Sequence, residues 1–203
     1  MRAGFSVIRA CCLLACLGLG TSCAQAVAPE KDLDCWYVPL ATKEKPTPEL
    51  EHFAACASVD RNGAIHVRQE HLRALDYDAS GLGSIQIADQ FFYVERSGRM
   101  AAVLTYDNGA DSFAEGMART RVDGKIGFFD TKLDVVIPAR YDWAWPFRGG
   151  RAMVCDGCRP GDPENQEHTP MVGGKWGFID PKGREVVPVR LSKEEALAMA
   201  PPG

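Results

Sequence analysis

The sequence predicts an all-β protein made of tandem antiparallel β-hairpin-type repeats in an open, curved stack, with a short C-terminal helix. Three observations predict this fold: a period of about 35 residues, strand-like alternation inside each period, and many turn residues. The 203 residues include 20 glycines and 13 prolines, which indicates many turns and short elements. A composition of 46% hydrophobic and 25% charged residues excludes a disordered or collagen-like chain.

A set of acidic residues shows the period most clearly. Asp60, Glu95 and Asp130 are each 35 residues apart, and Asp180 follows 50 residues later. Three residues after each acid stands a turn position: Gly63, Gly98, Leu133 and Gly183. Four residues before each acid stands an apolar or aromatic position: Cys56, Phe91, Ile126 and Trp176. Such a period marks an array of units, none of which can bury its apolar face alone.

The longer last interval indicates an insertion of 15 residues near residues 155–171. This stretch holds Cys155 and Cys158 together with several prolines and charged residues. We expect it to form a long surface loop whose base is closed by a bond between the two cysteines.

Within each unit, apolar residues alternate with polar residues or glycine, which is the period of a strand. Ile126 and Phe128 alternate with Lys125 and Gly127, and residues 175–178 repeat the pattern. Glycine inside a strand marks a bulge or a close approach of backbone. The runs 135–138 and 186–188 are β-branched strands that we expect to end at proline. A helix is expected only at the C-terminus, where Ser192 caps Lys193–Met199.

These residues resemble the bacterial WG (KWG) repeat family. Residues 113–118, 124–130, 135–138 and 141–142 resemble one full repeat, and residues 147–152 and 174–180 resemble the next, split by the insertion. The resemblance covers residues 56–189, which we assign as the repeat domain. A Pro-rich segment over 27–55 leads into this domain, and a C-terminal tail over 190–203 follows it. The family implies an all-β scaffold with no shared catalytic residues, so we predict none.

Residues 1–26 have the features of a secretory signal peptide. Arg2 and Arg9 give a positive start, and residues 10–20 carry no charge but are too short for a bilayer, which needs about 20 residues. Ala24-Gln25-Ala26 then offers a cleavage site before Val27. Alternatively, residues 19–23 resemble a lipobox, in which Cys23 would be lipidated. Both interpretations predict export, to the periplasm or medium or to a lipid-anchored state, without a membrane span.

Four cysteines remain after the signal segment: Cys35, Cys56, Cys155 and Cys158. An even number in an oxidising compartment predicts two disulfides. Three pairings are possible, and the local one joins Cys35 to Cys56 and Cys155 to Cys158.

Cys155-Asp156-Gly157-Cys158 is the sharpest local signal for chemistry. Redox catalysis requires the first thiolate at a helix N-terminus, which lowers its pKa. Here Arg159-Pro160-Gly161 follows and does not begin a helix well, so a structural disulfide is favoured. A thiol-disulfide site and a metal site, whose further ligands would come from His168 or from the Cys35/Cys56 pair, are the alternatives. We predict no bound metal and no cofactor.

Tyr141, Trp143, Trp145 and Phe147 alternate along one extended segment, so the four rings project from one face. They form either a binding platform for a sugar or peptide or, as we favour, the packing between repeats. The acids Asp107, Asp111, Glu115 and Asp142 allow a hydrolase interpretation, but turn and strand-end positions explain them more simply.

A net charge of −4 and a pI of 5.6 argue against a nucleic-acid partner. Nucleophile and phosphate-loop motifs are absent from the sequence. The sequence therefore predicts an exported, non-enzymatic repeat scaffold that binds an unknown protein or cell-envelope component. A periplasmic thiol-disulfide protein or a metal-binding module, each using Cys155 and Cys158, is the alternative.

Overall fold

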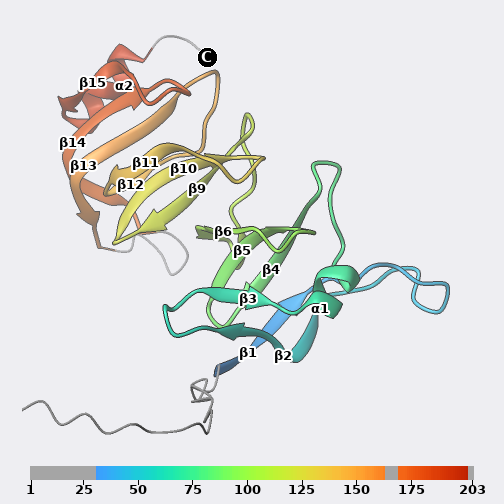
Figure 1. Cartoon of the computed structure of the whole chain (residues 1–203). Helices are drawn as coiled ribbons and strands as arrows, with labels where there is room; N and C mark the ends of the chain where they lie inside the picture. The colour runs from blue at the N-terminus through green and yellow to red at the C-terminus, as the bar shows by residue number, and fades with distance from the viewer. Residues whose placement is uncertain (1–30, 163–168, 201–203) are drawn as a thin grey trace, which may run out of the picture.

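A computed structural model describes residues 31–162 and 169–200, which fold into four three-stranded antiparallel meanders in chain order (Figure 1). The first contains β1 (Lys31–Tyr37), β2 (Glu51–Val59) and β3 (Ile65–Val67). The second contains β4 (Leu82–Ile87), β5 (Gln90–Glu95) and β6 (Met100–Val103). The third contains β9 (Met117–Val122), β10 (Lys125–Asp130) and β11 (Val135–Tyr141). The fourth contains β13 (Ala152–Pro160), β14 (Met171–Ile179) and β15 (Glu185–Leu191).

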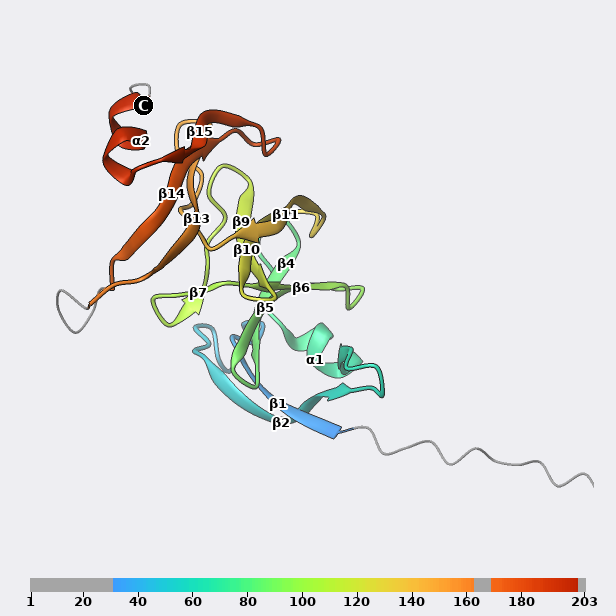
Figure 2. The ribbon, with the colours of Figure 1, turned by 90° about the vertical axis from the view of Figure 1, so that its left-hand side faces the viewer.

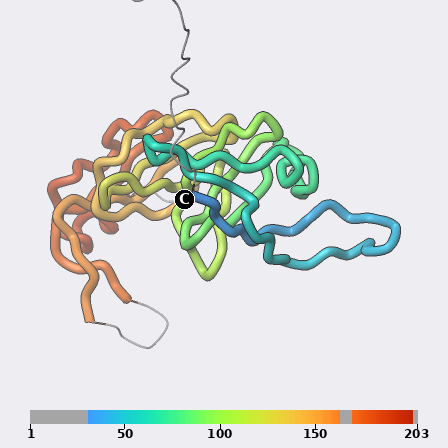
Figure 3. Tube along the Cα trace, turned by 60° about the horizontal axis from the view of Figure 1, so that its bottom comes forward, coloured from blue at the N-terminus to red at the C-terminus, as the bar shows by residue number. Residues whose placement is uncertain are grey.

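The meanders assemble into sheets that follow one another along an open, curved array (Figures 1 and 3). Because β1 pairs with β4, the first two meanders merge into one curled sheet of order β3-β2-β1-β4-β5-β6. The third forms the sheet β11-β10-β9, and the fourth gains β12 (Trp143–Ala144) in the order β12-β13-β14-β15. A hairpin of β7 (Thr105–Tyr106) and β8 (Gly109–Ala110) links the second meander to the third. The predicted all-β repeat fold in an open stack is confirmed.

The four acids of the 35-residue period occupy the same backbone setting. Each lies at the end of the second strand of its meander, and its N–H donates to the carbonyl four residues later, as from Asp130 to Asp134 (3.0 Å). The residue three positions on donates back to the acid and has a positive φ, from 60° at Leu133 to 89° at Gly98. Glycine adopts this conformation at little cost, which explains its recurrence.

The aspartate side chains tighten these turns. Asp130 Oδ1 accepts the N–H groups of Lys132 (2.9 Å) and Asp134 (3.0 Å), and the carboxylates of Asp60 and Asp180 accept the corresponding pair. Those backbone donors hold the pKa values of Asp60 and Asp180 below the usual value. The same turn also occurs at Asp78, before β4, where the sequence analysis did not place one.

Apolar side chains are buried between neighbouring meanders rather than inside each one. Leu82 and Val103 of the second meander pack with Ala118 and Phe129 of the third, and a further cluster joins the third to the fourth. The first two meanders share another cluster, and the fourth shares its own with the C-terminal helix. This chain of interfaces is expected for a repeat array, in which each unit contacts only its neighbours.

Gly127 and Gly177 are required by bulges in the neighbouring edge strands. A Cβ at Gly127 would lie 2.5 Å from the Ile137 carbonyl oxygen, and one at Gly177 would lie 2.4 Å from that of Val187. In both meanders the glycine lies between two paired positions of the middle strand and faces three residues of the edge strand. The predicted close approach of backbone is confirmed.

The prolines do not end their strands, contrary to the prediction. β11 continues through Pro138 to Tyr141, and β15 continues through Pro188 to Leu191. Both are edge strands, and each proline lies in the bulge. Proline lacks a donor N–H, so a bulge at a sheet edge accommodates it without losing a ladder hydrogen bond.

The C-terminal helix α2 (Lys193–Met199) forms as predicted. The Ser192 side chain accepts from the Glu195 N–H and the Glu195 carboxylate accepts from the Ser192 N–H, which completes a capping box. The expectation of no other helix is wrong, because α1 (Gln69–Ala74) follows β3. It is short and has no side-chain cap, and it is held by burial of Leu72, so sequence pattern does not reveal it.

The insertion near 155–171 extends a hairpin instead of forming a loop from Cys155 onward. β13 and β14 stay paired through Cys158↔Gly173 to Pro160↔Met171. Gly157, Gly173 and Gly174 all have positive φ. This conformation lets the hairpin continue past the break in pairing between Asp156↔Lys175 and Cys158↔Gly173. The segment assigned to 27–55 likewise holds β1 and the start of β2, two strands that the sequence analysis did not predict.

A buried ion pair joins the successive meanders. Arg119 on β9 is fully buried, and its Nε and Nη2 donate to the two carboxylate oxygens of Asp111 at 2.9 and 2.7 Å. Its Nη1 donates to the Ala144 carbonyl on β12 (2.8 Å). The guanidinium also lies between the rings of Tyr106 and Trp143, at 5.5 and 5.6 Å from their centroids.

Arg119→Ala is expected to lower the free energy of unfolding by about 3–5 kcal/mol, because it leaves the Asp111 carboxylate buried without a partner. Urea unfolding followed by far-UV circular dichroism measures the change. Arg121→Ala, on an exposed position of the same strand, is the control and should change stability by less than about 0.5 kcal/mol. Recovery of stability in the double variant Arg119→Met/Asp111→Leu supports this cause, and a neutral Arg119→Ala contradicts it.

Gly127→Ala is expected to destabilise the protein by about 1–3 kcal/mol, since its methyl group would meet the backbone of β11. Gly109→Ala is the matched control, because a Cβ there lies 3.8 Å from its nearest neighbour at an ordinary φ. Thermal unfolding of the two variants tests the bulge, and equal melting temperatures for both would refute it.

Candidate functional site

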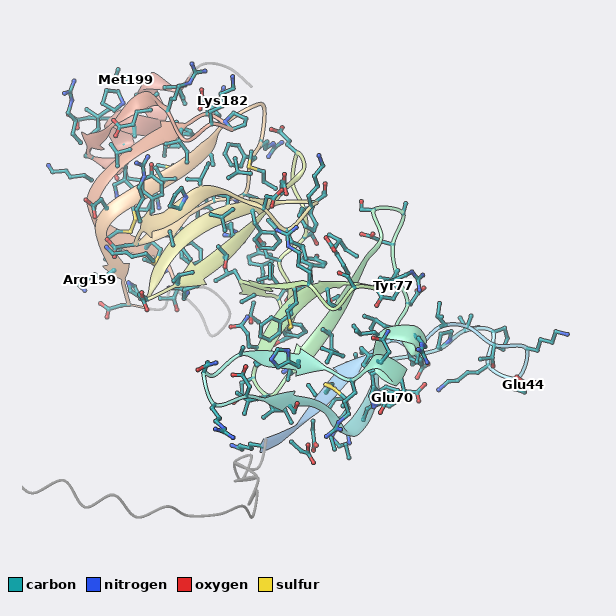
Figure 4. The ribbon with its side chains drawn as sticks, in the orientation of Figure 1. Glu44, Glu70, Tyr77, Arg159, Lys182 and Met199 are labelled. Carbon is teal, nitrogen blue, oxygen red and sulfur yellow. A yellow bond between two sulfur atoms is a disulfide. The ribbon has the colours of Figure 1, made fainter. Side chains whose placement is uncertain are left out.

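A groove of about 810 Å³ lies at the C-terminal end of the array. We call it the Trp145 groove. It is lined by the turn before β13, by Met153 of β13, by Phe178 of β14 and by Leu197 of α2. The turn contributes Trp145, Pro146, Phe147, Arg148, Gly149 and Arg151. In Figure 4, Met199 marks the end of α2 in this part of the molecule, far from Glu44 on the β1–β2 loop.

Backbone hydrogen bonds position the turn that forms the groove wall. The Trp145 N–H donates to the Met153 carbonyl (2.8 Å), and the Arg148 N–H donates to the Arg151 carbonyl (2.8 Å). Between them Gly149 and Gly150 have φ of 60° and 71°. These glycines reach a left-handed conformation that most other residues avoid.

Glu115 of the third meander fixes this turn through hydrogen bonds to its backbone. Its carboxylate accepts the Gly149 N–H (2.6 Å) and the Gly150 N–H (2.9 Å). Glu115 itself lies in the equivalent turn of its own meander, where Ala114 and Met117 pair as Arg148 and Arg151 do. One repeat therefore fixes the groove wall of the next, and Glu115 is a positioning residue.

The groove is apolar with a positive rim. Trp145 and Leu197 are 40% and 53% exposed, whereas Phe147 is buried beneath them and packs on Phe128 (4.9 Å between centroids). Arg148 is exposed, and Arg151 lies with its guanidinium 5.8 Å from the Phe178 ring centroid. None of the groove-lining residues within 31–162 and 169–200 is acidic.

The four aromatic residues singled out from the sequence do not share one environment. Tyr141 and Phe147 are buried in the cluster between the third and fourth meanders, and burial raises the pKa of Tyr141. Trp143 is half-buried, and its Nε1 has no hydrogen-bond partner in residues 31–162 and 169–200. Trp145 alone of the four is exposed. The four rings therefore do not project from one face, because the turn after β12 interrupts the extended segment.

Cys35 pairs with Cys56 between β1 and β2, with Cα atoms 5.8 Å apart, and Cys155 pairs with Cys158 within β13, with Cα atoms 6.1 Å apart. Three of the four cysteines are completely buried, and Cys158 is 7% exposed. The second pair lies on a strand, not at a helix N-terminus. The sequence analysis expected this bond to close the base of the inserted loop. It does not, because both cysteines belong to one strand. Residues 1–30, which include Cys23 and the predicted signal peptide, lie outside the described part.

The acids considered for hydrolysis serve the fold. Asp111 pairs with Arg119, and Asp142 accepts from Lys125 (2.7 Å) and from the Gly157 N–H (2.6 Å). The lysine lowers the pKa of Asp142. Asp107 lies in the β7–β8 turn with φ of 48°. Within the described ranges, no three His, Cys, Asp or Glu side chains group so as to hold a metal ion.

A family model described as "WG containing repeat" matches residues 91–125, 126–157 and 176–192. Each match begins in the middle strand of a meander, and the gap over 158–175 coincides with the extended β13–β14 hairpin. No curated protein and no solved structure matched the chain. No helix in the described ranges is long and apolar enough to cross a bilayer.

Loss of the two disulfides is expected to lower stability unequally. Cross-linking restricts the unfolded chain more when the closed loop is longer. The pairs are separated by 21 and 3 residues, so Cys35→Ala/Cys56→Ala should lower the free energy of unfolding by about 3 kcal/mol and Cys155→Ala/Cys158→Ala by about 2 kcal/mol. Urea unfolding measures both. Alkylation of the wild-type protein without reductant should find all four thiols blocked, and the reverse order of stability would contradict this account.

Proposed function

Because the chain is a WG-repeat-containing protein, we propose that it acts as an exported, non-enzymatic scaffold that binds a partner protein through the Trp145 groove. The exposed Trp145 ring above an apolar floor is the observation that carries this proposal. Repeat arrays act through extended surfaces that neighbouring units build together. Here the third meander supplies Glu115, which positions the turn, and the fourth supplies most of the wall.

The lining of the groove has the composition of a protein-binding surface. Trp145, Phe147, Phe178 and Met153 are residue types enriched in interfaces, as is arginine. Methionine is unbranched and adapts to the shape of an apolar ligand side chain. Leu197 comes from α2, which the capping box holds at its start, so the groove exists before a ligand arrives. A preformed groove lowers the entropy lost on binding.

Charge complementarity identifies the kind of segment that fits. Among the described residues that line the groove, Arg148 and Arg151 are the only ionisable ones, although the whole chain has a net charge of −4. Arg148 is exposed, so we expect the partner segment to carry a large apolar side chain for the groove floor and an Asp or Glu for Arg148. Arginine pairs with a carboxylate in a two-point geometry that lysine does not reproduce.

The thiol-disulfide alternative has less support. A reactive thiolate needs exposure and a nearby positive potential such as a helix N-terminus. Cys155 is fully buried within β13, opposite Trp176. Oxidised, buried cysteines agree with an oxidising compartment and thus with the proposed export. In this proposal the two cysteine pairs are structural disulfides.

A random-peptide phage library selected against the purified protein tests the proposal. We expect enriched sequences with a large apolar residue close to Asp or Glu. A synthetic peptide of the consensus should bind the wild-type protein, and Trp145→Ala should lose about 2 kcal/mol of binding free energy, which is about thirtyfold in Kd by isothermal titration calorimetry.

Two arginine variants separate charge from contact area. Arg148→Lys keeps the charge but loses the two-point geometry, whereas Arg148→Gln loses both, so binding should fall in the order wild type, lysine, glutamine. Val135→Ala, on an exposed edge of the third meander, is the control surface variant and should bind as the wild type does. Selection of no common sequence, or equal affinity of wild type and Trp145→Ala, overturns the proposal.

A further inference from the structure

The strands β1 and β2 of the first sheet lie at the end of the array opposite α2 (Figure 2). Strand register places a row of side chains across the outer face of this sheet. His52 pairs with Trp36, Trp36 pairs with Gln86, and Gln86 pairs with Phe91, across β2, β1, β4 and β5. Directly paired residues of antiparallel strands project from the same face. The opposite face carries Cys35, Ile85 and other members of the buried cluster, so this row points outward. We call it the Trp36 row.

The centre of the row is an exposed ring between polar groups. Trp36 is 44% exposed, and its ring centroid lies 4.9 Å from that of the His52 imidazole. On the other side the Gln86 carboxamide makes no hydrogen bond to a residue in the described ranges. Phe91 is half-buried, because the next meander covers part of it.

A β-bulge in the β1–β2 pair places the Asp34 carboxylate beside His52 of the Trp36 row. The register of β1 and β2 shifts between Leu33 and Cys35, where Asp34 lies. Asp34 accepts the N–H of Ala55 (2.9 Å), a non-glycine residue with φ of 50°, and contacts His52 Nε2 (3.2 Å). The Ala55 N–H holds the pKa of Asp34 below its usual value. The Cys35–Cys56 bond joins the two strands beside this bulge, so the carboxylate and the imidazole are held in position.

From this arrangement we propose that the Trp36 row binds an uncharged saccharide chain. The apolar C–H face of a pyranose packs against an indole ring, while its equatorial hydroxyl groups need hydrogen-bond partners at the edge of that ring. Asp34, His52 and Gln86 are such partners on both sides of Trp36. Three strand spacings of about 4.8 Å put His52 and Phe91 about 14 Å apart, the length of about three pyranose rings in an extended chain.

The charges on this face favour a ligand without charge. Asp34 is paired with His52, and Asp32, also on the outer face of β1, is paired with Arg68. The two carboxylates of β1 therefore have partners within the protein. A ligand with a full charge would have to compete with these pairs, whereas hydroxyl groups can share the same oxygens and nitrogens.

Isothermal titration with cellotetraose, chitotetraose and maltotetraose tests the inference. We expect binding of at least one of the two extended chains, cellotetraose or chitotetraose, and weaker binding of maltotetraose, whose linkage curves the chain away from a flat row. Trp36→Ala should weaken binding by about tenfold or more, and Gln86→Ala should weaken it to a lesser degree. Both side chains are at least partly exposed, so thermal unfolding should show both variants folded.

Trp145→Ala is the matched control, since it removes an exposed tryptophan from the other end of the array. It should leave saccharide binding unchanged, as Trp36→Ala should leave binding in the Trp145 groove unchanged, so either proposal can fail alone. Absence of heat with all three saccharides overturns the inference. A dimer in sedimentation velocity that Trp36→Ala dissociates also overturns it, because the row would then contact a second copy of the chain.

Discussion

The buried pair of Arg119 and Asp111 is the interaction on which the relation between meanders depends. Asp111 follows the β7–β8 hairpin after the second meander, Arg119 lies on β9 of the third, and the Ala144 carbonyl that Arg119 also contacts begins the fourth. A buried charge pair adds little net stability, but breaking one is costly, because the remaining charge has no partner. The pair therefore acts mainly to specify one arrangement: a shift between neighbouring meanders would leave it unsatisfied.

The ends of the array need other means of stabilisation, since a terminal repeat has a neighbour on one side only. Each described disulfide lies in a terminal meander, Cys35–Cys56 in the first and Cys155–Cys158 in the fourth. The β1–β2 connection of the first meander and the paired ends of β13 and β14 in the fourth lie at opposite ends of the molecule in Figure 3. The helix α2 covers β14 and β15 and buries Ala196, so it closes the C-terminal end of the core.

The two candidate binding surfaces lie at the two ends of the array. The Trp145 groove forms where the last meander meets α2, and its apolar floor and arginines suit a protein segment with acidic residues. The Trp36 row lies on the first sheet, where the next meander covers only the part near Phe91. Its ring lies between His52, which is paired with Asp34, and Gln86, and these polar groups suit hydroxyl groups. One repeat scaffold thus presents two different chemistries, because repeats in the middle are covered on both sides and terminal repeats are not.

Features that depend on residues close along the chain can be predicted from local sequence patterns. The turns at the four acids, the strand period around Ile126, the glycines within strands and the Ser192 cap all follow from local hydrogen bonding and side-chain alternation. The strands that lie at a sheet edge, and so the reason why β11 continues through Pro138, depend on how distant segments pair. The tertiary structure also determines which aromatic side chains stay exposed. Coverage by a neighbour depends on pairings between distant residues, such as β1 with β4, and no local pattern encodes those.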